Sequence, residues 1–145
     1  MHWVTITAGS SHTCGITDAG NAYCWGSNRA GQLGDGTSGI GATRAQPALV
    51  AGGQKWKAIA AGALHTCGVT TAGKAYCWGD DYLGQLGNGT AGDAGTSAVP
   101  VAVVGAQAWT SVFASNFETC AVSQDGKGWC WGDNSTAQVG DPASV

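Results

Sequence analysis

The sequence predicts an all-β fold of about three β-propeller blades, each a sheet of four antiparallel strands. The chain of 145 residues contains 25 glycines, and only 10% of its residues are charged, which is typical of a turn-rich β protein. A repeat of about fifty residues with four short strands is typical of a propeller blade. The register is marked by residues that recur at a spacing of 53: Trp3, Trp56 and Trp109, and Cys14, Cys67 and Cys120.

The first three strands of a blade follow from the residue types of the first repeat. Residues 3–8 alternate in a strand-like pattern, and residues 12–17 are rich in threonine and β-branched side chains. A three-residue turn at 18–20 ends in Gly20, where we expect a positive φ. Residues 22–25 form the third predicted strand.

A fourth strand is predicted after a glycine-rich loop that begins at residue 26. Proline opens this strand at 47–50 and again at 100–104. Because proline lacks a backbone N–H, we expect this strand at the edge of the sheet. The third copy contains no such segment, so its blade is expected to lack the outer strand. The single partial propeller domain, residues 1–145, then divides into three repeats: 3–55, 56–108 and 109–145.

The six cysteines form three pairs with one spacing. The turn at 18–20 places Cys14 opposite Cys24 on adjacent strands, with Cβ atoms about 4.5–5.5 Å apart, so a disulfide needs only a small adjustment. Paired cysteines indicate an oxidising compartment, and we expect an extracellular or cell-surface protein. Reduced thiols or a metal site are the alternatives, although no C-x-x-C motif supports metal. The predicted pairs are Cys14 and Cys24, Cys67 and Cys77, and Cys120 and Cys130.

Charge and hydropathy argue against two classes of partner. The net charge of −3 gives no electrostatic reason to bind nucleic acid or an anionic membrane. No apolar run approaches the roughly 18 residues of a membrane span. Met1 leads directly into the first predicted strand with no signal peptide, so we expect that the start is incomplete.

The repeated motifs resemble the regulator-of-chromosome-condensation repeat over nearly the whole chain. They read A-G-x-x-H-T-C, then D/T-x-G-x-A-Y-C-W-G, then G-Q-L-G-D/N-G-T. The cysteine-bearing form resembles that of secreted or surface-exposed bacterial proteins. The resemblance implies a propeller, usually seven-bladed, with about one repeat in each blade. The third copy departs from the motifs at Ser115, Glu118 and Val139.

Three blades do not close a propeller, which typically has about 4–8. Two apolar blade faces would stay uncovered. Either the chain belongs to a longer propeller, or copies of it complete a ring, for example a six-bladed dimer with two-fold symmetry.

Positions shared by the repeats are expected to serve the fold. We therefore interpret His12 and His65 as structural side chains whose hydrogen bonds tie the turn between two strands of one blade. We interpret the repeated tryptophans as packing between blades. The loops that vary are the candidates for binding, because exposed tyrosine and arginine are typical anchors. The predicted binding residues are Arg29, Asp81, Tyr82, Asn134 and Phe117.

The sequence therefore favours a non-catalytic propeller scaffold for protein–protein interaction or self-assembly. A lectin-like propeller that binds a glycan is the alternative. We expect no enzyme activity, cofactor or metal, because no carboxylates converge and no nucleophile is paired with a base. Guanine-nucleotide exchange is not expected either, since a fold does not carry a function.

Overall fold

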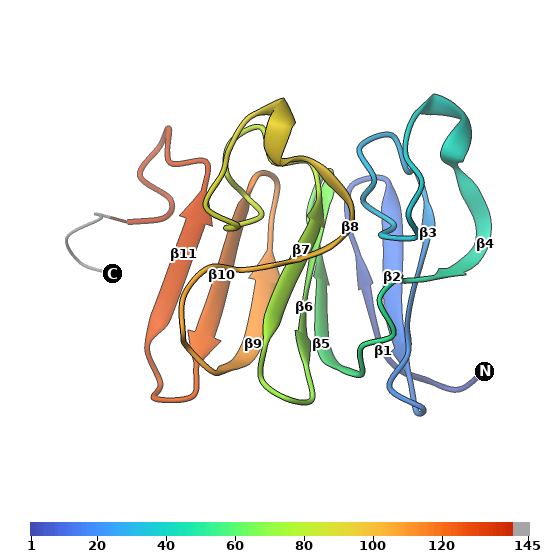
Figure 1. Cartoon of the computed structure of the whole chain (residues 1–145), viewed down its shortest axis with the longest axis horizontal. Coiled ribbons are helices and arrows are strands. Elements are labelled where there is room, and N and C mark those ends of the chain that lie inside the picture. The colour runs from blue at the N-terminus through green and yellow to red at the C-terminus, as the bar shows by residue number, and fades with distance from the viewer. Residues whose placement is uncertain (141–145) are drawn as a thin grey trace.

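The computed structural model describes residues 1–140 and contains three antiparallel sheets that stand side by side as blades (Figure 1). The first blade consists of β1 (Trp3–Ala8), β2 (His12–Thr17), β3 (Ala22–Gly26) and β4 (Arg44–Leu49). The second consists of β5 (Trp56–Ala61), β6 (His65–Thr70), β7 (Ala75–Gly79) and β8 (Ser97–Ala102). The third consists of β9 (Trp109–Ala114), β10 (Glu118–Ser123) and β11 (Gly128–Gly132).

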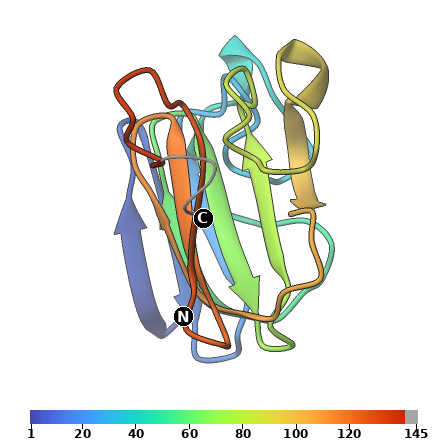
Figure 2. The same ribbon diagram turned by 90° about the vertical axis from the view of Figure 1, so that its left-hand side faces the viewer.

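The strands of each complete blade pair in the order of the sequence, so the predicted all-β blade architecture is confirmed. Strand β5 contacts both β1 and β9, and these three strands form the inner side of the stack. The outer strands β4 and β8 lie on the opposite side, as the blue β1 and gold β8 show in Figure 2. A short 3-10 turn precedes each outer strand: η1 (Ile40–Ala42) and η2 (Asp93–Gly95).

The outer strands begin three residues earlier than predicted, at Arg44 and Ser97. Strand β4 pairs irregularly with β3: Gly26 lies opposite Arg44, and the register then shifts before Cys24 meets Ala48. Pro47 lies in this irregular stretch of an edge strand, where its missing N–H removes no regular ladder bond. The sequence prediction started the strand at proline because it did not foresee the irregular pairing before it.

The predicted hairpin register is confirmed. Ile16 pairs with Ala22, and Cys14 lies directly opposite Cys24. Gly20 has φ 75°, as the turn requires. All three cysteine pairs are disulfide-bonded, with Cα atoms 4.0–4.1 Å apart, so the thiol and metal alternatives do not apply.

The blades are joined by a buried backbone carbonyl. The Gln32 carbonyl of the first blade accepts hydrogen bonds from the Thr66 hydroxyl at 2.7 Å and the Trp78 indole N–H at 3.0 Å. At the next junction, the Gln85 carbonyl accepts the same two bonds from Thr119 at 2.8 Å and Trp131 at 3.0 Å. The third blade therefore packs against the second through the same hydrogen bonds by which the second packs against the first.

The repeated Gly-Gln-Leu-Gly segment is shaped for this junction. Leu33 and Leu86 have no exposed surface. Gly34 has φ 69°, and a Cβ there would lie 2.6 Å from the Trp78 indole nitrogen. A side chain at Gly34 would push Trp78 away from the carbonyl, which explains the glycine. Trp78 and Trp131 thus pack between blades, as the sequence predicted for the repeated tryptophans.

The junction predicts unequal costs for two equivalent tryptophans. Trp78→Phe removes the buried donor to Gln32 and should cost about 1–2 kcal/mol more than Trp25→Phe. Trp25 occupies the same repeat position on the uncovered flank of the first blade, and its indole N–H has no protein partner among residues 1–140. Urea unfolding of both variants measures the difference. Equal losses would mean that the hydrogen bond to Gln32 contributes nothing to the stability of the fold.

The disulfides predict a second effect on stability. Each closes a loop with a sequence separation of ten, and loss of such a loop should cost about 3 kcal/mol through the entropy of the unfolded chain. The double substitution Cys67→Ala and Cys77→Ala should therefore lower the free energy of unfolding by about that amount. Reduction of the unaltered protein provides the comparison. An unchanged unfolding midpoint in both experiments would contradict a stabilising role for the bridges.

Candidate functional site

The loops that differ among the repeats lie on one face, at the upper end of the strands in Figure 1, which we call the loop face. Each blade contributes two segments that a backbone hydrogen bond joins. In the second blade, the N–H of Asp80 donates to the carbonyl of Leu64 over 2.9 Å, and the other blades have the equivalent bond. The loop face consists of residues 10–11, 27–30, 63–64, 80–83, 116–117 and 133–136.

Three of the predicted binding residues expose their side chains on the loop face. Tyr82 is 64% exposed, Phe117 is 37% exposed and Arg29 is also exposed. Leu83, which the sequence prediction omitted, lies beside Tyr82 and is 41% exposed. The second and third blades thus present apolar side chains, whereas the equivalent loop of the first blade presents a cation. The binding role of these residues stays a prediction.

Asp81 differs from the prediction, because its side chain is fully buried. Its carboxylate accepts a hydrogen bond from the backbone N–H of Leu86 at 2.9 Å. Asn28 accepts the equivalent bond from Leu33 at 3.0 Å in the first blade. The carboxylate therefore shapes its own loop and is not available to a partner. An acceptor five residues before the repeated Leu was the sequence signal for this role.

Asn134 is exposed but has the same local role. Its side-chain oxygen accepts a hydrogen bond from the N–H of Val139 at 3.1 Å, and its amide donates to the carbonyl of Gly140 at 3.2 Å. Both polar ends of the side chain are used within the loop. Asn134 is therefore a weaker candidate for binding than Arg29, Tyr82 or Phe117.

The two complete blades place a loop carboxylate at different positions. In the first blade, Asn28 donates to Asp35 at 3.1 Å, and Arg44 pairs with the same carboxylate at 3.0 Å. Burial acts to raise the pKa of Asp35, but hydrogen bonds from Thr37 and the charge of Arg44 hold it below its usual value. In the second blade, burial raises the pKa of Asp81. The same loop geometry thus tolerates either arrangement.

The repeated histidines connect neighbouring blades, rather than the turn between two strands of one blade as the sequence suggested. His12 Nε2 lies 2.8 Å from the Thr66 hydroxyl oxygen, and His65 Nε2 lies 2.9 Å from that of Thr119. Because each threonine gives its proton to a glutamine carbonyl, the histidine must supply the proton to the threonine oxygen. Both imidazoles are therefore protonated at Nε2, and burial, which lowers the pKa of each to about 4, keeps them neutral near pH 7. Their role is structural.

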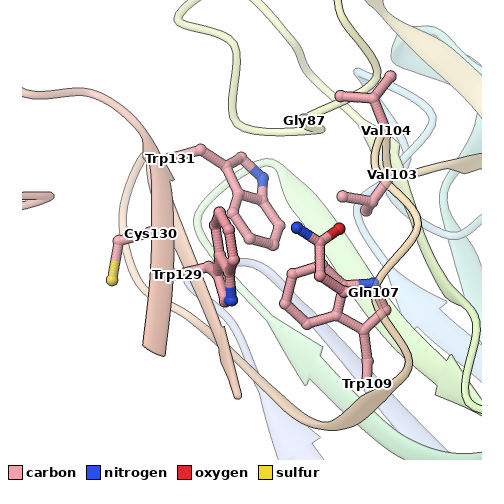
Figure 3. A pocket seen from close by; sticks show the side chains of 8 residues that line it. All are labelled: Gly87, Val103, Val104, Gln107, Trp109, Trp129, Cys130 and Trp131. Carbon is pink, nitrogen blue, oxygen red and sulfur yellow. The ribbon is translucent and has the colours of Figure 1, made fainter. Parts of the chain in front are cut away.

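An apolar hollow with a volume of ≈ 270 Å³ lies beside a tryptophan cluster at the edge of the third blade (Figure 3). Trp129 and Trp131 of β11 face Gln107 and Trp109 across it. The hollow lies away from the loop face, and its tryptophans belong to the packing of the blade. Among residues 1–140, no group of three or more His, Cys, Asp or Glu side chains could hold a metal ion. The same part of the chain contains no helix of the length and hydropathy needed to cross a membrane.

Comparison with known protein families identifies the repeat. A model described as the regulator of chromosome condensation (RCC1) repeat matches residues 19–69 and 72–122, and a second model of that description matches 3–32 and 56–85. The ultraviolet-B receptor UVR8 of Arabidopsis thaliana is 34% identical over 142 residues, covering 93% of this chain and 30% of that protein. The X-linked retinitis pigmentosa GTPase regulator of Mus musculus is 33% identical over 139 residues, covering 94% of this chain and 14% of that protein.

Comparison with solved structures gives the same result. A chain in the crystal structure of Kap60 bound to yeast RCC1 (Prp20) superposes with a TM-score of 0.82 and 25% sequence identity. The match covers 97% of this chain and 34% of that chain. The chain therefore spans about a third or less of the length of these similar proteins.

The buried histidines predict a loss of stability in acid. Burial lowers the pKa of His12 and His65 to about 4, against an ordinary value of 6.5. The unfolded chain therefore binds protons first, and stability that is complete above pH 6.5 is lost as the pH falls toward 4. Between neutral pH and about pH 4.5, each histidine should cost about 2–3 kcal/mol.

Urea unfolding across this pH range measures the effect. His65→Gln keeps a donor for Thr119 and should remove about half of the acid sensitivity in this range, whereas His2→Gln, at an exposed position, should remove none. An acid transition unaffected by His65→Gln would contradict the assignment of neutral, buried imidazoles.

Proposed function

The chain belongs to the regulator of chromosome condensation (RCC1) repeat family, and from this premise we propose that it is a non-catalytic propeller scaffold that binds another protein through its loop face. The observation that carries the proposal is the exposed group Tyr82, Leu83 and Phe117 on an otherwise repeated framework. Aromatic side chains are enriched in protein interfaces, and tyrosine is one of the residue types that dominate their binding energy.

The contrast between repeated and varied positions supports this proposal. His65, Gln85, Leu86 and Trp78 have equivalents in another blade, and all four are fully buried. The positions that vary most lie in the loops that those buried residues support. A rigid framework with variable exposed loops is the usual arrangement for recognition.

The second and third blades hold their apolar loops together. The N–H of Ala63 lies 3.1 Å from the carbonyls of both Ser115 and Asn116, so the turns of the two blades are in contact. Each of these turns is also hydrogen-bonded to the loop of its own blade. In the second blade, that loop carries Tyr82. The apolar residues therefore lie on a fixed framework, which lowers the entropic cost of binding a partner.

The activities of the similar proteins differ, since one is a receptor for ultraviolet-B light and another a GTPase regulator. Yeast RCC1 is bound by the protein Kap60 in the solved structure. A shared fold does not decide between these tasks, so the proposal rests on the loop face of this chain.

The three disulfides are compatible with an oxidising compartment, and we propose an extracellular or cell-surface location. We also propose that further blades cover the two exposed flanks.

The loop face predicts site-specific crosslinking. A photoreactive amino acid at position 82 or 117 should crosslink to the same protein partner in the native host, whereas one at the exposed position 49 of β4 should not. Once that partner is purified, Tyr82→Ala should weaken its binding at least about tenfold, the loss expected for an aromatic anchor.

Leu83→Ala and Leu49→Ala form a matched pair of controls, because both leucines are exposed but only Leu83 lies on the loop face. Equal effects of these two substitutions on binding would contradict the proposed surface. Binding of glycans that is lost with Tyr82→Ala, without a protein crosslink, would instead support a lectin.

A further inference from the structure

The junctions between blades are built as a relay of hydrogen bonds in which each proton is used once. His12 Nε2 donates to the Thr66 hydroxyl oxygen, and the Thr66 hydroxyl donates to the Gln32 carbonyl. The relay from His65 through Thr119 to Gln85 is the same. All members of both relays are buried, so a missing proton would leave an acceptor unpaired at a high cost.

The outer flank of the third blade carries a different side chain at the start of the relay. Glu118 occupies the repeat position of His12 and His65: it lies opposite Gly132, as His12 lies opposite Gly26. Gln138 occupies the position of Gln32 and Gln85. The flank therefore presents a carboxylate and a backbone carbonyl, which are both acceptors. The one proton of a threonine hydroxyl satisfies only one of them.

A second difference lies at the neighbouring turn. A Cβ at Gly9 would overlap the carbonyl oxygen of Gly62, and a Cβ at Gly62 would overlap that of Ser115. The glycines therefore allow the turns of adjacent blades to approach closely. The third blade has Ser115 at this position, and its Cβ prevents a following blade from approaching to the same distance.

The free flank of the first blade, in contrast, carries the same donor residues as the flanks by which the second and third blades pack on their neighbours. Thr13 and Trp25 occupy the positions of Thr66 and Trp78, and neither side chain has a hydrogen-bond partner among the described residues. A second copy of the chain would thus bring Thr13 against Glu118. Glu118 Oε2 already accepts the backbone N–H of Phe117 at 3.2 Å, but its other oxygen has no donor among the described residues. Thr13 has one proton for that oxygen and the Gln138 carbonyl, so one of these two acceptors would stay without a donor.

We propose that the outer flank of the third blade is a selective junction, which accepts a blade with lysine or arginine at the threonine position and discriminates against a second copy of this chain. An ammonium or guanidinium group has several protons, so it can donate to Glu118 and to the Gln138 carbonyl together. The wider spacing that Ser115 imposes suits a side chain longer than threonine. Glu118 is then the residue that determines the neighbour of the third blade.

The chain itself provides the test, because Thr13 can be given the required charge. Thr13→Lys should convert a monomer into an assembly. The dissociation constant for self-association should be at least about tenfold lower than that of the unaltered protein. Addition of Glu118→Gln to this variant should abolish the gain. Thr43→Lys, at an exposed position away from the flank, adds the same charge and should leave the protein monomeric. Sedimentation velocity at low and high salt measures each state.

A reciprocal change tests the same junction from the other side. Ser115→Gly combined with Glu118→His restores the relay and the close approach, so it should allow Thr13 of a second copy to dock. Thermal unfolding confirms that each variant is folded, and Thr13→Arg replaces Thr13→Lys if the latter is not. Two results would overturn the proposal: assembly of the unaltered chain that Thr13→Val abolishes, or no more association with Thr13→Lys than with Thr43→Lys.

Discussion

Two buried donors of the second blade, the Thr66 hydroxyl and the Trp78 indole, meet on the backbone carbonyl oxygen of Gln32. No single blade can supply this arrangement, because the acceptor lies in a loop of the first blade and the donors lie on strands of the second. A buried indole N–H or carbonyl without a partner is costly. The stacking of blades is therefore specified by hydrogen bonds of fixed direction as well as by apolar contact.

Most of the repeated residues serve this one contact. Gly34 makes room for the Trp78 ring, and Leu33 belongs to the same buried cluster as Trp78. His12 donates to the Thr66 oxygen, which in turn donates its own proton to the Gln32 carbonyl. The disulfide between Cys67 and Cys77 ties the two strands that carry the donors Thr66 and Trp78. The strands can thus hold their donors in place while the loops above them vary.

The variation in the chain falls into two groups with different consequences. At Tyr82 and Phe117, the varied side chains are exposed and do not contribute to the junctions, which suits recognition of a partner. At Ser115 and Glu118, the changes affect the junction itself, where backbone approach and proton supply are fixed by geometry. The sequence differences among the repeats thus lie both in exposed loops and at the flank of the third blade.

The sequence by itself determined the blade, its hairpin register and its disulfides, because these depend on contacts within about fifty residues and on turns such as the one at Gly20. It also separated repeated from varied positions. Only the tertiary structure decided that Asp81 is buried, that His12 bonds to Thr66, and that Glu118 accepts the backbone N–H of Phe117. These features depend on atoms brought together from different strands and blades, and no local pattern of residue types specifies such distances.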